Sequence, residues 1–160
     1  MKISDKVNTQ TIVLPLQSTC KYDVLQELLN HCMLLDYLTS TEKLISDLDE
    51  KEKKMNSASG RGIAYHYNAS VEVDNMIAVL GISKEGIDYH APDGLSCNFI
   101  LLILEPQSKE ELHRHFINCF QDMISDISVK EKLLDASTGI EIEEIIKIWE
   151  DQLSIDNELL

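Results

Sequence analysis

The stretch Asn98-Phe-Ile-Leu-Leu-Ile-Leu-Glu-Pro106 contains the longest unbroken apolar run of the chain, residues 99–104. Six apolar residues cannot cross a bilayer, which needs about 20 in a helix. A short continuous apolar run is typical of a central strand that is buried on both faces. We therefore expect this segment to form the middle of a β-sheet that helices cover.

The segments on either side of this strand alternate between strand and helix patterns. Apolar, β-branched stretches predict strands at 11–16, 62–67, 76–83 and 95–104. A stripe of apolar residues spaced three and four apart predicts a helix over 21–33, with Ser18 or Thr19 as its N-cap. Thr39 and Glu42 have the spacing of a capping box at the start of a second helix.

The last third of the sequence predicts three helices. Each begins at a capping-box pair, and these pairs are Ser108 and Glu111, Ser128 and Glu131, and Thr138 and Glu141. The order of strand, two helices, several strands and three helices predicts an α/β fold, a single domain with a mixed β-sheet covered by helices. We assign residues 1–153 to this domain and residues 154–160 to an acidic C-terminal tail that begins to fray after about Asp151.

Composition excludes several classes of function. The net charge is −14, from 28 acidic and 14 basic residues, and such a surface repels a nucleic-acid backbone but steers a basic protein partner. The N-terminus lacks the apolar stretch of a signal peptide, so we expect a cytoplasmic protein without direct membrane insertion. The four cysteines form no C-x-x-C pair and are expected to be reduced, and no metal or organic cofactor is implied.

Two histidines are candidates for chemistry. His66 follows the small-residue loop 55–62, whose backbone N–H groups at 59–62 could hold an anion, and a histidine beside such a loop can accept a phosphoryl group. His113 and His115 lie near the start of a predicted helix and point about 200° apart, so they do not form a two-histidine metal site by themselves. A metal-binding domain that uses both and nearby acids is the third-ranked hypothesis. His31 and His90 are interpreted as structural.

Several segments in order resemble the type-2 enzyme IIA family of the phosphotransferase system, which includes mannitol/fructose-specific and nitrogen-regulatory IIA proteins. Gly60-Arg-Gly-Ile-Ala64 is similar to the family's Gly-x-Gly-x-Ala before its active histidine. Ile87-Asp-Tyr-His-Ala-Pro-Asp-Gly94 matches its Ile-x-Phe-x-Ala-x-Asp-Gly pattern, and Glu111-Leu-His113 resembles the helix that carries its second active-site histidine. The resemblance covers about residues 1–150 and implies the fold of that family.

The resemblance implies a phosphoryl acceptor and a helper. In the family, one histidine accepts a phosphoryl group from the carrier protein HPr or its nitrogen-branch paralogue, and a second histidine stabilises the transferring charge. By this resemblance His66 and His113 are the catalytic residues, the acceptor and the stabiliser. The partners implied are an HPr-type carrier and, downstream, a IIB domain or a regulated transporter or kinase.

The family motif continues as Gly-x-Gly-x-Ala-x-Pro-His, and this sequence departs from it. Without a gap, His66 falls on the family's proline, Tyr67 falls on its histidine, and Lys51-Glu52 falls on its Arg-Glu. A one-residue slip on a strand sends a side chain to the opposite face, so this register puts Tyr67 in the site. A one-residue deletion would instead put His66 there.

Two hypotheses for function therefore stay open. The first is a stand-alone enzyme IIA-like protein of the nitrogen-regulatory type, which accepts a phosphoryl group on His66 and acts in regulation or in a sugar relay. The second is a non-phosphorylated module of the same fold that regulates by protein docking. The sequence leaves open whether the chain is an enzyme, which signal it serves and which oligomeric state it adopts.

Overall fold

The computed structural model describes residues 1–107 and 111–159 and contains one mixed five-stranded sheet. The strand order is β1-β4-β5-β3-β2, and the bounds are β1 Ile12–Val13, β2 Ala58–Gly60, β3 Ile63–Ala69, β4 Ile77–Ile87 and β5 Cys97–Glu105. The β1–β4 and β3–β5 pairs are parallel, whereas β4–β5 and β2–β3 are antiparallel. The predicted single α/β domain with a mixed sheet is confirmed.

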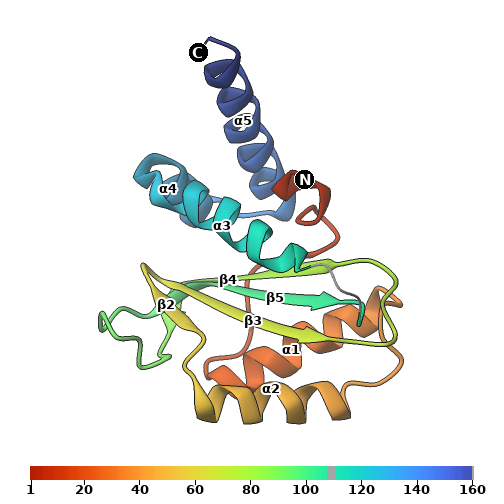
Figure 1. The fold of residues 1–160 in the computed structure, drawn as a ribbon. Coiled ribbons are helices and arrows are strands. Elements are labelled where there is room, and N and C mark those ends of the chain that lie inside the picture. Colours follow the sequence, from red (N-terminus) through yellow and green to blue (C-terminus); the bar gives the residue numbers. More distant parts are fainter. Residues whose placement is uncertain (108–110, 160) are drawn as a thin grey trace.

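The apolar run 99–104 forms the central strand, as its composition predicts. Every side chain of this run is fully buried, because alternate residues enter the two separate cores on the faces of the sheet. Phe99, Leu101 and Ile103 belong to the core under one helical layer, and Ile100, Leu102 and Leu104 belong to the other. Figure 1 shows these two layers, with α1 and α2 on one side of the sheet and α3, α4 and α5 on the other.

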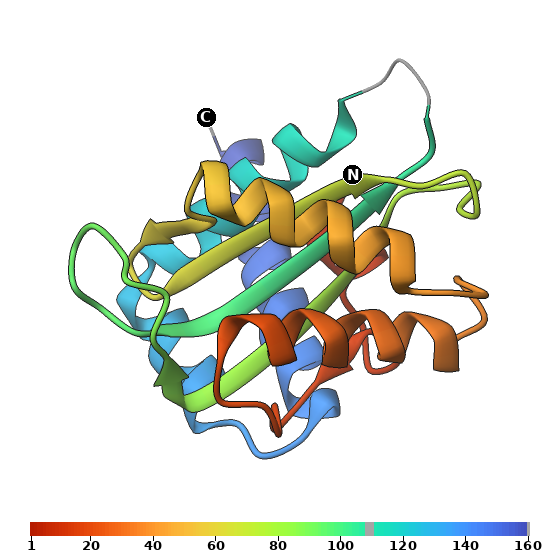
Figure 2. The same ribbon diagram turned by 90° about the horizontal axis from the view of Figure 1, so that it is seen from below.

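Helices α1 (Lys21–Leu34) and α2 (Glu42–Lys54) lie side by side across one face of the sheet (Figure 2). The helix predicted over 21–33 begins where we expected and ends one residue later, at Leu34. The N-caps predicted for α1 and α2 are wrong. Cys20 and Thr41 occupy the N-cap positions, and neither side chain makes a capping hydrogen bond. The Thr39 hydroxyl donates instead to Glu72, which ties the start of α2 to the loop after β3.

The second layer contains α3 (Leu112–Ser125), α4 (Ile127–Asp135) and α5 (Gly139–Glu158), together with the short 3-10 helix η1 (Ile3–Asp5). Thr138 caps α5 as predicted, because its hydroxyl accepts a hydrogen bond from the Glu141 N–H. Asp126, not Ser128, caps α4. Ser108 of the third predicted capping box lies outside the described residues.

Helix α5 runs beyond the position where we expected fraying, through most of the segment assigned to an acidic tail. Its last residue is Glu158, and residues 151–159 are all exposed to solvent. Among the described residues, no helix is both long and apolar enough to cross a membrane.

Candidate functional site

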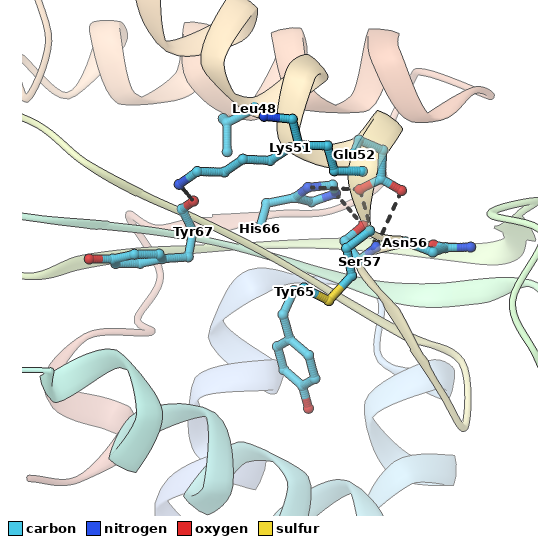
Figure 3. A pocket seen from close by; sticks show the side chains of 10 residues that line it. Leu48, Lys51, Glu52, Asn56, Ser57, Tyr65, His66 and Tyr67 are labelled. Carbon is cyan, nitrogen blue, oxygen red and sulfur yellow. Dashed lines mark hydrogen bonds and ion pairs between the residues drawn. The ribbon is translucent and has the colours of Figure 1, made fainter.

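Successive side chains of β3 point to opposite faces of the sheet, and this decides which of them can contact α2 or α3. Ala64 of β3 packs in the core beneath α1 and α2, and His66 points to that same side. Tyr65 and Tyr67 pack against the opposite core, beneath α3. Figure 3 shows His66 on the side of α2 and Tyr65 on the other side of the strand. His66 and Tyr67 therefore face opposite layers, as consecutive residues of a strand must.

Tyr67 stacks on the ring of His113, which lies in the first turn of α3. The two ring centroids are 3.8 Å apart and the planes differ by 15°. This is the arrangement that the ungapped family register predicts, with a phenol where that register has an imidazole. The structure does not bring His66 and His113 together, since the sheet lies between them.

Glu105, the last residue of β5, fixes the position of His113. The carboxylate is 3% exposed, and its Oε1 accepts a hydrogen bond from the His113 backbone N–H at 2.6 Å. Its Oε2 lies 2.9 Å from His113 Nδ1, so the ring donates Nδ1–H to the carboxylate. This contact engages Nδ1 of the ring and leaves Nε2 for other partners.

Replacing Glu105 by glutamine should lower the free energy of unfolding by about 2 kcal/mol, because a buried amide cannot accept from both N–H groups. Chemical denaturation measures this change. The matched control is Glu111→Gln, since Glu111 is 60% exposed and pairs with the exposed Arg114, and its loss should stay below about 0.5 kcal/mol. Equal losses in the two variants would contradict the role assigned to Glu105.

Glu105 is not among the site residues that the sequence predicts. A signal was present in the sequence, since a carboxylate that directly follows six buried apolar residues is unusual and needs a partner. The partner, a histidine eight residues away, could not be inferred without the position of α3.

His66 is enclosed between the sheet and α2, with 3% of its surface exposed. Its Nε2 lies 2.9 Å from the Tyr89 hydroxyl and 3.4 Å from Ser57 Oγ. Its Nδ1 lies 4.0 Å from Glu52 Oε2, and Lys21 pairs with the same carboxylate at 2.8 Å. Both ring nitrogens are thus directed at groups of the protein itself.

The pKa values of the two candidate rings follow from these surroundings. Burial lowers the pKa of His66 to about 4, an effect that Glu52 opposes and Lys21 reinforces. Burial raises the pKa of Tyr67, and the nearby carboxylates of Glu105 and Glu111 raise it further. At neutral pH, His66 is therefore an uncharged imidazole and Tyr67 an uncharged phenol.

A groove of about 500 Å³ runs along the outer edge of β3, between this strand and the end of α2 (Figure 3). Tyr65, Tyr67 and Met55 contribute to its lining, and Met55 is 77% exposed. Lys51 donates hydrogen bonds to the Tyr67 carbonyl and to Asn68 Oδ1, and its amine lies 5.1 Å from the Tyr67 ring centroid. The residue that aligns with the family's arginine thus contacts the residue that aligns with the family's histidine.

The turn 60–62 belongs to the segment 59–62, where we expected an anion cradle, and it already holds a carboxylate. All three residues have positive φ, and the Arg61 N–H donates to Asp93 Oδ2 at 2.8 Å. A side chain at Gly60 would contact the same oxygen at 3.0 Å. Lys130 donates to the Arg61 carbonyl. The turn therefore joins β2 and β3 to the loop before β5 and to α4, and the Arg61 N–H of the expected cradle already has a carboxylate partner.

The remaining histidines lie apart from this site. His31 Nε2 contacts the Gln10 carbonyl at 2.6 Å, and the His90 ring lies exposed beside Asp88. His115 contacts Cys119 Sγ at 3.7 Å on α3. Within residues 1–107 and 111–159, no cluster of three or more His, Cys, Asp or Glu side chains could hold a metal ion.

Comparison with known proteins gives a consistent result. A sequence profile described as phosphoenolpyruvate-dependent sugar phosphotransferase system, EIIA 2, matches residues 6–148. The fructose-specific EIIABC component of Bacillus subtilis is 23% identical over 146 residues, which are 91% of this chain and 23% of that protein. The fructose-specific EIIA component of Haloferax volcanii is 25% identical over 97 residues, 61% of this chain and 63% of that protein. The chain thus spans less than two thirds of either relative.

Solved structures share the fold. The nitrogen regulatory protein IIA-Ntr from Neisseria meningitidis superimposes with a TM-score of 0.79 at 21% identity, over 90% of this chain and 98% of that chain. The IIA mannitol structure from Escherichia coli superimposes with a TM-score of 0.72 at 18% identity, over 88% of this chain and 99% of that chain. A further neighbour is the Escherichia coli IIA mannitol domain in complex with phosphorylated IIB, with a TM-score of 0.69 at 17% identity over 89% and 97% of the two chains.

Proposed function

Because this chain belongs to the EIIA type-2 family of the phosphoenolpyruvate-dependent sugar phosphotransferase system, we propose that it is a docking module that regulates a partner protein without carrying a phosphoryl group on histidine. The observation that carries the proposal is the stack of Tyr67 on His113 at 3.8 Å. A phenol with a raised pKa is a poor nucleophile for reversible phosphoryl transfer at neutral pH.

The charges around this pair support the same conclusion. A transferring phosphoryl group needs cations or N–H donors around its oxygens. Here the carboxylate of Glu105 lies against His113, and the amine of Lys51 is already bound to two oxygens of β3. While position 67 is a phenol, the site is better suited to binding a protein surface through Tyr67, His113 and the exposed Leu112 than to accepting a phosphoryl group.

The candidate partners are those of the family, namely an HPr-type carrier, a IIB domain, or a transporter or kinase that the module regulates. The complex of the Escherichia coli IIA domain with its IIB partner supports the view that this fold binds other proteins of the relay. Of the two family roles, regulation of the nitrogen-regulatory type is the one that we favour, because a sugar relay would need phosphoryl transfer.

Phosphorylation on His66, with His113 as helper, remains the competing prediction. It draws support from the family resemblance and from the groove that His66 helps to line. For this mechanism, a carrier would have to reach a nitrogen that now contacts Tyr89 and Ser57.

Incubation with a radioactively phosphorylated HPr-type carrier separates the two functions. We expect no alkali-stable, acid-labile phosphate on the chain, but binding of the carrier or a IIB domain that Leu112→Asp weakens about tenfold in calorimetry. Leu95→Asp, at an exposed leucine in the loop before β5, is the control. A label that disappears in His66→Ala or His113→Ala would overturn the proposal in favour of the phosphocarrier.

A further inference from the structure

The second half of α5 projects from the body of the protein (Figure 1). The buried residues of this helix are Ile142, Ile146 and Glu150, all within its first twelve positions. Residues 151–159 are exposed, although they include Leu153, Ile155 and Leu159. Exposed apolar side chains on a projecting helix contribute little to its stability by themselves, so they point to a partner.

Three exposed apolar residues of α5 and its C-cap, Ile148, Ile155 and Leu159, fall in line with the half-buried Ile145 and the polar Gln152, and we call these five positions the seam. Going along the helix, successive seam positions are three, four, three and four residues apart, which is the spacing of the a and d positions of a coiled coil. These positions are Ile145, Ile148, Gln152, Ile155 and Leu159. Ile148 and Ile155 are each 58% exposed, and Leu159 is 80% exposed. Ile148, Ile155 and Leu159 lie on the side of the helix away from Ile142 and Ile146, which belong to the core on this face of the sheet.

Most of this seam is outside the part of the chain that matches the family. The profile ends at residue 148, so Gln152, Ile155 and Leu159 belong to a segment that the family relation does not explain. The surface is also distinct from the site at Tyr67 and His113, and it would stand if the proposed function failed.

Charge along the seam restricts what can cover it. Glu144, Asp151 and Glu158 recur every seven residues and flank the seam on one side, at the g positions of the same heptads. Asp156 lies at an e position on the other side. In a parallel pair of two copies, Asp151 of each copy would face Asp156 of the other, and in an antiparallel pair the g positions would face one another. Both arrangements oppose like charges, so a second copy is disfavoured.

We propose that the outer face of α5 binds an amphipathic helix of a partner protein, with apolar residues in heptad spacing and lysine or arginine beside them. The apolar seam supplies the area to be buried, and the three acidic g positions select a basic partner and set its alignment. Gln152, at a central a position, can pair with a polar residue and fix the register.

Two synthetic peptides of about 21 residues test the proposal, since three heptads are enough to cover the seam. Both carry isoleucine and leucine at a and d, and one has lysine and the other glutamate at e and g. Trp149, the only tryptophan of the chain, is next to seam residue Ile148 and gives a fluorescence readout of binding. We expect the lysine peptide to bind at least about tenfold more tightly than the glutamate peptide, a preference that shrinks with added salt.

Variants of α5 make the test specific. Ile155→Ser should abolish binding of the lysine peptide, whereas Ile140→Ser should not, because Ile140 is equally exposed at 59% but lies off the seam. The triple variant Glu144→Lys, Asp151→Lys and Glu158→Lys should reverse the preference toward the glutamate peptide. Circular dichroism verifies that each variant is folded.

Three outcomes would overturn the proposal. They are equal or absent binding of the two peptides, equal loss in Ile155→Ser and Ile140→Ser, and a dimer in sedimentation that Ile155→Ser dissociates. The last outcome would assign the seam to a second copy of the chain.

Discussion

Replacing Tyr67 by histidine is expected to convert a chain that takes no phosphoryl group into one that carries a stoichiometric acid-labile phosphate. The new imidazole would occupy the place of the phenol ring, beside His113. Its nitrogen would form the N–P bond as the bond to the histidine of the phosphorylated HPr-type carrier breaks, so the carrier is the leaving group. An imidazole has an ordinary pKa near 6.5 and is a far better acceptor than a phenol near 10.

A second tyrosine of β3 offers a matched control for the gain of phosphorylation in Tyr67→His. Tyr65 lies on the same strand and face, but its ring packs edge-on against Phe120 at 6.4 Å between centroids, so Tyr65→His should remain unlabelled. Tyr67→His combined with His113→Ala should accept more slowly, if His113 stabilises the transferred charge. Labelling of the unaltered chain at the rate of Tyr67→His would contradict the docking function. A folded Tyr67→His chain that stays unlabelled would contradict the view that Tyr67 replaces the acceptor.

The fold could be predicted because its strongest signals are local. The apolar run 99–104 is too short for a helix of a core and too continuous for a half-exposed strand, and it became the central strand. The stripe in 21–33 and the cap at Thr138 likewise specify structure within a few residues. The N-caps of α1 and α2 were mispredicted because the candidate side chains hydrogen-bond elsewhere, Ser18 to Glu27 and Thr39 to Glu72.

The site was less predictable because it depends on which face of β3 each side chain points to. Residues 66 and 67 differ by one position, and strand geometry then sends them to opposite faces. The sequence allowed either register, and only the pairing of β3 with β5 and the position of α3 show that Tyr67 meets His113. The contacts of Glu105 and Asp93 could not be predicted from the sequence either, since each joins residues from separate elements.

A second large effect is expected in the dependence of stability on pH. The pKa of His66 is lowered to about 4 by burial, whereas the unfolded chain has an ordinary value near 6.5. The unfolded state therefore binds more protons between these values, and stability falls as the pH falls through this window. His66 alone should remove about 2 kcal/mol between pH 7.5 and pH 5.0, and about 3 kcal/mol by pH 4.

Replacing His66 by glutamine should remove this pH-dependent loss while keeping a neutral polar group beside Tyr89. At pH 7.5 the variant is expected to be less stable than the unaltered chain, because the imidazole fits its enclosure, and the difference should shrink by about 2 kcal/mol at pH 5.0 in urea denaturation. His90→Gln is the control, since that ring is 84% exposed, and it should keep the original pH profile. A His66→Gln chain that loses stability in acid as steeply as the original would mean that His66 is not buried as a neutral ring. The same burial that depresses this pKa keeps both ring nitrogens away from a carrier protein, so a smaller acid loss in His66→Gln would also strengthen the case against His66 as a phosphoryl acceptor.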